Sequence, residues 1–355
     1  MEPGESEGRA VSITLKDVAD RLGVSPMTIS YALRGHASVS AAMRERVKVV
    51  ANELGYRPNS AARAMLSGHF KTVASVYAVH RDGLRQTSRS ELLAGYSSAL
   101  HASGMQLTLA AMDADQSQGV KGKPILLRER AVDGLLIDYD IRVAQGWMEE
   151  LSSLGVPSIH VNDKQKADCV YPDDFGGAQA ATEYLLMIGH RRVLCFIDGR
   201  LHPLDEPPAH YSAPDRVAGY RAAMKAAGRI PQVVHAKVGS AEAQEQIRAF
   251  LAASDRPTAV LCAGGENPVN IYFCASMAGL RVPNDLSIVT LHYEQYIAPA
   301  TVATWHIPLR ETGHFAVKQL LKKIAAPTQR LVPMTIPYEK VDLGSTVCSP
   351  ASNVR

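Results

Sequence analysis

Residues 25–34 carry side chains whose types and spacing suit contacts with double-stranded DNA. Ser25 can cap a helix, and Pro26 fits the first turn because a proline there gives up no hydrogen bond. An apolar stripe of Val24, Ile29 and Leu33 predicts the buried face. The other face carries small or hydrogen-bonding side chains, namely Pro26, Met27, Thr28, Ser30 and Tyr31. A helix with such a face fits the major groove from its N-terminal end, where the helix dipole also favours phosphate.

A second helix is predicted immediately before this one. Thr14 and Asp17 form a capping-box pattern, and Gly23 can supply the left-handed residue that ends a helix. Between them, apolar residues recur at helical spacing on one face: Leu15, Val18, Ala19 and Leu22. Two short helices around a tight turn indicate a helix-turn-helix, although such pairs also occur in helical domains that bind no DNA. A third amphipathic helix, from Ser40 to about Leu54, completes a predicted three-helix head.

The distribution of charge agrees with DNA binding by this head. Residues 1–71 contain 10 Lys and Arg against 7 Asp and Glu, whereas residues 72–355 contain 28 of each kind. The net charge of +3 therefore lies in the first fifth of the chain. A local basic region on a neutral body is what neutralisation of phosphates requires. A charge excess of this size also occurs on ordinary solvated surfaces, which is the alternative reading of this pattern.

Composition excludes several other classes. The chain has 355 residues, 46% of them hydrophobic, which suits two or three globular domains. We expect no signal peptide, because the first 13 residues are polar and acidic, and no membrane span, because no apolar run approaches ~18 residues.

The cysteines are odd in number, far apart and without metal spacing: Cys169, Cys195, Cys262, Cys274 and Cys348. They indicate reduced, cytoplasmic thiols. We expect no metal and no cofactor, and structural or pocket-lining roles for His190 and His292.

From Thr72 onward, β-rich runs alternate with helical periods. Strands are expected at about 73–79, 106–111, 134–138, 158–161, 193–197, 233–236, 259–262, 287–291 and 334–341. Helices are expected at about 90–103, 147–154, 177–189, 216–227, 241–253, 269–278 and 309–324. This alternation predicts parallel sheets in two doubly wound units, and hence a body of two lobes. A ligand cleft is expected between the lobes, at the carboxyl ends of the strands.

Strings along nearly the whole chain resemble the LacI/GalR family of bacterial transcriptional repressors. In the head they are residues 14–19, 23–25, 28–30, 46–47, 53–59 and 62–63. In the body they include Gly189-His190-Arg191-Arg192, Arg216-Val217-Ala218-Gly219-Tyr220, Arg256-Pro257-Thr258-Ala259 and Gly279-Leu280-Arg281-Val282-Pro283. The resemblance implies an α/β protein with a helix-turn-helix head, a hinge helix and a bilobed body like that of periplasmic binding proteins. It places the head at residues 1–57, the hinge at 58–70 and the body at 71–355, with one lobe at about 71–171 plus 304–326 and the other at about 172–303 plus 327–348.

The resemblance also implies how DNA is bound. Two heads of a homodimer bind two half-sites of a near-palindromic operator, with Met27 and Tyr31 reading base edges beside Pro26. Thr28, Ser30 and Ser25 contact phosphate, and the remaining DNA contacts expected in the head are Thr14 and Arg34. Residues 59–66 match the family's hinge helix, which pairs with its dimer mate in the minor groove. The hinge contacts are expected from Asn59, Ala62, Met65 and Leu66.

The sequence offers two candidates for the inserted hinge residue, and it limits the size of the assembly. An apolar side chain of the hinge is expected to insert between base pairs, and either Met65 or Leu66 can supply it. Packing of both residues between head and body is the alternative. So short a helix is marginal alone, which itself predicts a dimer mate. No apolar heptads follow the last predicted strand, so we expect a dimer and no larger assembly.

The effector site of the family is only partly kept in this chain. Arg216 stands where an Arg holds the effector, but Val238 replaces a stacking aromatic, Gly264-Gly265 replaces Asn-Asp, and Tyr293 replaces an Asp that binds sugar hydroxyls. Unless Glu294 supplies the missing carboxylate, a larger, anionic or aromatic effector is therefore expected rather than a simple sugar; the alternative is that no effector is bound. The expected site residues are His210, Ser212, Arg216, Gly264, Tyr293 and Glu294. His210 and Ser212 could equally be ordinary loop residues.

Arg216 carries the most specific expectation at this site. With its usual Asp partner replaced by Tyr293, its guanidinium should be free to fork onto an anionic group. The alternative is that Arg216 only caps a loop and pairs with Asp173 or Asp215.

Two other classes of protein fit less well. An enzyme is not expected, because the chain has no Gly-rich phosphate loop, nucleophile elbow or metal spacing. The neighbouring acids Asp173 and Asp174 face opposite ways if extended, which suits acid–base cooperation poorly. A periplasmic-type binding protein fits the bilobed body but not the head or the missing leader. The sequence thus predicts a cytoplasmic, nucleoid-associated DNA-binding repressor, a bacterial protein with no membrane partner.

Overall fold

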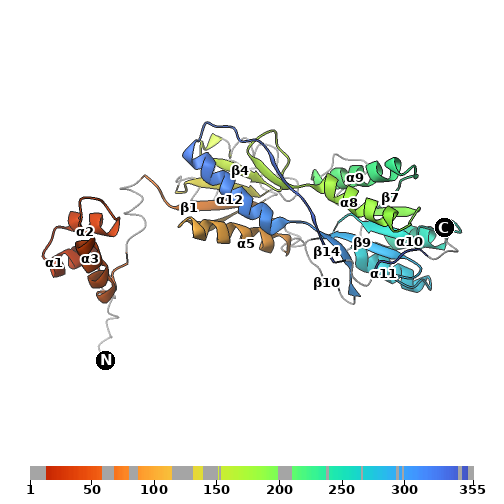
Figure 1. Cartoon of the computed structure of the whole chain (residues 1–355), viewed down its shortest axis with the longest axis horizontal. Helices are drawn as coiled ribbons and strands as arrows, with labels where there is room; N and C mark the ends of the chain where they lie inside the picture. Colours follow the sequence, from red (N-terminus) through yellow and green to blue (C-terminus); the bar gives the residue numbers. More distant parts are fainter. Residues whose placement is uncertain are drawn as a thin grey trace, which may run out of the picture. The chain divides into compact units, whose positions relative to one another are not determined.

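The computed structural model describes residues 13–57, 68–79, 87–113, 131–138, 151, 153–198, 210–236, 240–264, 267–292, 296–297, 300–342 and 346–350. The chain divides into two compact units, Met1–Phe70 and Lys71–Arg355 (Figure 1). The predicted hinge contacts Asn59, Ala62, Met65 and Leu66 lie outside the described residues, as do Tyr293 and Glu294.

Three helices form the head: α1 (Leu15–Leu22), α2 (Pro26–Leu33) and α3 (Ala41–Glu53). Thr14 and Ser25 cap α1 and α2 as predicted, and Ser40, the predicted start of the third helix, caps α3. Their apolar faces enclose one small core of buried side chains: Val18, Ala19, Ile29, Ala32, Val39, Val47 and Ala51. The head is therefore held together by contacts made within residues 13–57.

The first sheet of the body contains six parallel strands in the order β13-β5-β4-β3-β1-β2. The strands are β1 (Thr72–Val79), β2 (Gln106–Asp113), β3 (Gly134–Asp138), β4 (Ser158–Val161), β5 (Cys169–Pro172) and β13 (Met334–Ile336). Helices α5 (Thr87–Ala102) and α12 (Leu309–Ala325) pack together on one face of the sheet (Figure 1). A Cβ on Gly95 would lie 2.2 Å from the carbonyl oxygen of Arg310, so these two helices meet backbone to backbone.

The second sheet also has six strands, in the order β14-β12-β9-β8-β6-β7, all parallel to their neighbours except β14. The strands are β6 (Val193–Asp198), β7 (Gln232–Ala236), β8 (Ala259–Cys262), β9 (Ser287–His292), β12 (Ala303–His306) and β14 (Glu339–Asp342). Helices α8 (Asp174–Met187) and α9 (Ser212–Ala226) cover one face, and α10 (Ala241–Ala252) and α11 (Asn267–Met277) cover the other. A short antiparallel pair, β10 (Tyr296–Ile297) and β11 (Ala300–Thr301), lies outside both sheets.

The packing of α8 against α9 positions the site described below. A Cβ on Gly219 would lie 2.1 Å from the carbonyl oxygen of Phe175, so only glycine permits this contact. The close approach brings the first turn of α8 next to the first turns of α9.

The chain passes between the two sheets three times, which corrects the predicted lobe boundaries. It leaves the first sheet after β5, returns after β12 and leaves again after β13. Residues 304–306 thus belong to the second sheet and 334–336 to the first, contrary to the expectation. The single strand predicted at 334–341 is two strands, because Ile336 pairs with Pro172 whereas Glu339 pairs with His306. No break separates the two strands in the sequence pattern except Pro337, and their pairing partners show that they are distinct.

None of the helices in the described part of the chain is long and apolar enough to cross a membrane.

Candidate nucleic-acid interface and effector site

Local hydrogen bonds at the ends of α1 set the position of the helix that follows. The backbone N–H of Thr14 donates to Asp17 Oδ2 (2.7 Å), and the backbone N–H of Asp17 donates to Thr14 Oγ1 (3.4 Å). The bonds from Thr14 hold the pKa of Asp17 below its usual value. At the other end, Gly23 has the left-handed φ of 67° that the turn requires. The predicted helix-turn-helix geometry is confirmed at both ends of α1.

The N-terminal end of α2 presents the predicted reading face. Ser25 Oγ accepts the backbone N–H of Thr28 at 3.1 Å, and the two hydroxyls lie 2.9 Å apart. Ile29 is fully buried on the inner face, whereas the Met27 side chain is 64% exposed on the outer face. An exposed thioether flanked by hydroxyls can offer apolar contact to a base and hydrogen bonds to phosphate.

The C-terminal end of α2 holds Tyr31 and Arg34. Arg34 Nε donates to the carbonyl oxygen of Ser30 at 3.2 Å, and its guanidinium lies 5.2 Å from the centre of the Tyr31 ring. The expected contacts Ser25, Met27, Thr28, Ser30, Tyr31 and Arg34 thus lie on α2 or directly beside it. Thr14 stands apart from them, at the start of α1.

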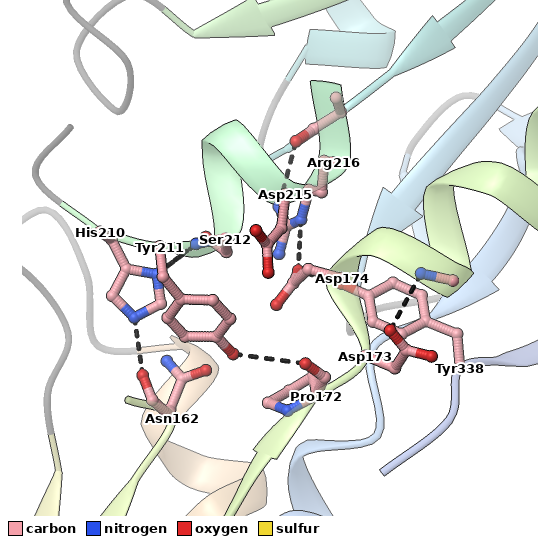
Figure 2. A network of polar contacts seen from close by, with 12 residues as sticks. Asn162, Pro172, Asp173, Asp174, His210, Tyr211, Ser212, Asp215, Arg216 and Tyr338 are labelled. Carbon is pink, nitrogen blue, oxygen red and sulfur yellow. Dashed lines mark hydrogen bonds and ion pairs between the residues drawn. The ribbon is translucent and has the colours of Figure 1, made fainter. Parts of the chain in front are cut away.

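In the body, Arg216 lies at the centre of a buried polar network between α8, α9 and the segment that joins β13 to β14 (Figure 2). Its Nε donates to Asp174 Oδ1 at 2.6 Å, and one Nη donates to the carbonyl oxygen of Ala263 at 3.0 Å. The Tyr338 hydroxyl donates to the same Asp174 oxygen at 2.5 Å. Burial raises the pKa of Tyr338 well above its usual value, so this hydroxyl stays protonated and remains a donor.

The expectation that Arg216 is free of a carboxylate is therefore wrong, and so is the alternative that it pairs with Asp173 or Asp215. Asp173 caps α8 by accepting the backbone N–H of Gly176, and Asp215 pairs with Lys164 at 2.6 Å. A buried guanidinium requires a compensating charge, and α8 supplies it through Asp174, which is 1% exposed. The other oxygen of this carboxylate, Oδ2, is buried and accepts no hydrogen bond from the described residues.

The predicted residues His210 and Ser212 lie beside this network. His210 Nδ1 lies 2.8 Å from Ser212 Oγ, and His210 Nε2 lies 2.7 Å from the carbonyl oxygen of Asn162, which follows β4 of the first sheet. The nearby pair of Lys164 and Asp215 also joins the two lobes. Gly264 directly follows Ala263, whose carbonyl accepts from Arg216. The structure thus brings together Arg216, His210, Ser212 and Gly264.

Sequence reasoning missed two members of the site, Asp174 and Tyr338. Asp174 stands four residues before the fully buried Ala178 on α8, and that spacing is a signal that could have placed it on the buried face. Tyr338 gave no local signal, because its role depends on the crossing between the sheets. Its ring lies against α8 so closely that a Cβ on Gly177 would be 2.5 Å from it.

Two family descriptions match this chain. Residues 14–59 match the bacterial regulatory proteins of the lacI family, and residues 182–346 match the periplasmic binding protein-like domain. The ribose operon repressor of Escherichia coli (strain K12) is 28% identical over 326 residues, covering 89% of this chain and 94% of that protein. The HTH-type transcriptional repressor PurR of Erwinia tasmaniensis is 29% identical over 336 residues, covering 88% and 91%.

Solved structures share the fold. The lac repressor dimer bound to operator and the anti-inducer ONPF superposes with a TM-score of 0.74 at 22% identity, covering 95% of this chain and 100% of that one. The complex of the transcriptional regulator CelR with cellobiose superposes with a TM-score of 0.62 at 24% identity, covering 94% and 99%. In both cases the likeness extends over head and body.

Proposed function

Because the chain belongs to the lacI family of bacterial regulatory proteins, we propose that it represses transcription as a dimer on a near-palindromic operator, under the control of an effector bound beside Arg216. The chain is a DNA-binding transcriptional repressor with a ligand-binding body, and its relatives are repressors rather than enzymes. The observation that carries the proposal is the capped, outward-facing N-terminal end of α2.

On this proposal, Met27 and Tyr31 read base edges, while Ser25, Thr28 and Ser30 contact phosphate. In the hinge, Met65 or Leu66 inserts into the minor groove. Tyr31→Ala should then change operator preference, at a cost of about 1–3 kcal/mol at the base pair that Tyr31 reads. The measurement is selection from a random pool of duplexes with the wild-type and variant proteins. Identical consensus sequences for the two would remove Tyr31 from the reading face.

A second copy of the chain is the partner that α11 fits. Its outer face carries Val269, Phe273 and Met277 at intervals of four residues, with exposed fractions of 42%, 53% and 59%. A stripe of this kind along one helix is typical of a surface that a partner covers. We expect light scattering at micromolar concentration to show a dimer, and Phe273→Asp to shift it toward monomer. Ile230→Asp, at an apolar residue that is 86% exposed elsewhere on the body, is the matched control. A tetramer, or a dimer indifferent to Phe273→Asp, would contradict this assignment.

The proposed effector site contains Arg216, Asp174, His210, Ser212 and Gly264, together with the predicted Tyr293 and Glu294. Arg216 uses Nε and one Nη for Asp174 and Ala263, so further guanidinium hydrogens remain, and the buried Asp174 Oδ2 has no hydrogen-bond partner among the described residues. Because Asp174 neutralises Arg216, the reason for expecting an anionic effector no longer holds. The proposed site therefore offers donors and an acceptor side by side.

The effector proposal is tested by removing both charges of the pair. Arg216→Gln combined with Asp174→Asn should keep operator binding but abolish its response to whichever compound acts on the wild type, because ligand binding must differ between two states to shift DNA affinity. Operator affinity is titrated against sugars, sugar acids and nucleosides. A double variant that responds like the wild type would remove the pair from the site.

A further inference from the structure

We infer that His36 is a positioning residue for DNA recognition, because it stacks on Tyr31 and fixes the orientation of that ring on the reading helix. The two rings lie 4.7 Å apart between centres, with 20° between their planes. The inference rests on the proposed role of Tyr31 as a base reader and adds a residue that positions it.

The termination of α2 places the His36 ring on Tyr31. Gly35, with a φ of 72°, lies just past the helix, and its N–H donates to the carbonyl oxygen of Ala32 at 3.1 Å. The N–H of His36 donates to the carbonyl oxygen of Tyr31 at 3.0 Å. This pair of bonds is the Schellman motif, in which the side chain two positions past the cap returns to the last turn of the helix. In this chain both side chains that meet there are aromatic.

The His36 ring is itself held in place. Its Nδ1 accepts the backbone N–H of Ser38 at 3.2 Å and lies 2.7 Å from the Ser38 hydroxyl. Because an acceptor nitrogen carries no hydrogen, these bonds fit the tautomer in which the ring hydrogen is on Nε2. Two contacts from Ser38, both to Nδ1, thus orient the ring that packs on Tyr31.

Arg34 adds a second restraint on Tyr31. Its Nε is bound to the carbonyl oxygen of Ser30, which keeps the guanidinium 5.2 Å from the centre of the Tyr31 ring. Ordering a side chain before binding avoids an entropic cost that would otherwise be subtracted from the affinity. Loss of the His36 stack should therefore weaken binding at the base pair that Tyr31 reads by about 3- to 10-fold.

The test measures discrimination at one base pair with the full-length protein. The duplex is the best half-site pair selected by the wild type, and the position read by Tyr31 is the one whose preference Tyr31→Ala changes. His36→Ala should lower affinity for the preferred base pair by about 3- to 10-fold, reduce discrimination there, and leave affinity for unrelated DNA unchanged. His36→Phe, which keeps an aromatic ring at the stack, should restore discrimination. His101→Ala, at an exposed histidine of the body, is the matched control.

Two results would overturn the inference. If Tyr31→Ala changes a preference and His36→Ala leaves discrimination at that position intact, Tyr31 reads the base without help from His36. If His36→Ala instead weakens binding equally on all sequences, His36 contacts phosphate or only supports the fold. If Tyr31→Ala changes no preference, the reading role proposed for Tyr31 fails first, and the role of His36 fails with it.

Discussion

The reading face of the head and the Arg216 site of the body are built over very different distances along the chain. In the head, Thr14 bonds to Asp17 and Ser25 to Thr28, each three residues away. In the body, Arg216 bonds to Asp174 across 42 residues, and Tyr338 bonds to Asp174 across 164. The head is thus specified by local helix caps, whereas the effector site exists only after both sheets and their helices have packed.

The two regions also differ in what surrounds their polar groups. Within residues 13–57, the side chains expected to contact DNA are mostly exposed, so water solvates them when DNA is absent. Asp174 and Arg216 are buried, at 1% and 8% exposed. Changes in the head should therefore alter the affinity for DNA or the stability of one helix end. Changes at the Arg216 site should alter the stability of the body.

The largest expected effect is that of Asp174→Ala, which leaves the Arg216 charge buried without a partner. The free energy of unfolding of the body should fall by about 3–5 kcal/mol. Urea unfolding followed by tryptophan fluorescence measures this, because both tryptophans of the chain, Trp147 and Trp305, lie in the body. Lys164→Ala breaks a pair whose lysine side chain is 46% exposed and should cost less than about 1 kcal/mol. Equal losses of unfolding free energy in the two variants would contradict the expected difference between buried and exposed charges.

A smaller loss is expected for Tyr338→Phe, which removes one hydrogen bond to a buried carboxylate and keeps the ring. Hydrogen bonds to charged groups contribute about 1.5–3 kcal/mol, and the unfolding free energy should fall by that amount. Tyr272→Phe is the control, because Tyr272 packs partly buried against a core cluster and no hydrogen bond of its hydroxyl occurs among the described residues. If the two variants unfold at the same urea concentration, Tyr338 contributes packing alone.

The smallest effect is expected in the head, where Ser25→Ala removes the cap of α2. Loss of a serine cap costs about 1 kcal/mol, and only the helix it caps should open more often. Hydrogen exchange of peptides covering residues 26–33 measures the change, while tryptophan fluorescence should show no change in the body. A shift of the body transition in this variant would mean that the two units depend on each other for stability.

The same contrast decides how much could be predicted from the sequence. Both ends of α1 and the start of α2 were predicted from Thr14, Gly23 and Ser25, because caps act within one turn of the helix. The strands Gly134–Asp138, Ser158–Val161 and Ala259–Cys262 were predicted with both boundaries. The strands at Cys169–Pro172 and Ala303–His306 were missed, because a run of four residues carries little periodicity.

The candidate site was predicted in the same uneven way. Arg216 was placed by a motif, but its partner Asp174 was seen only as one of two neighbouring acids. Which acid faces Arg216 depends on the contact of α8 with α9 at Gly219, and the role of Tyr338 depends on the third crossing between the sheets. Neither contact is encoded within a single element.

The three crossings also set an order of events during synthesis. The head core is complete once the ribosome has released residue 57, so the head can fold early and alone. The first sheet begins at Thr72 but lacks its edge strand until Met334–Ile336 has emerged, and α12 reaches its face only shortly before. The lobe that begins first is thus completed almost last. A nascent chain stalled near residue 300 should hold a folded head and an unfinished first lobe.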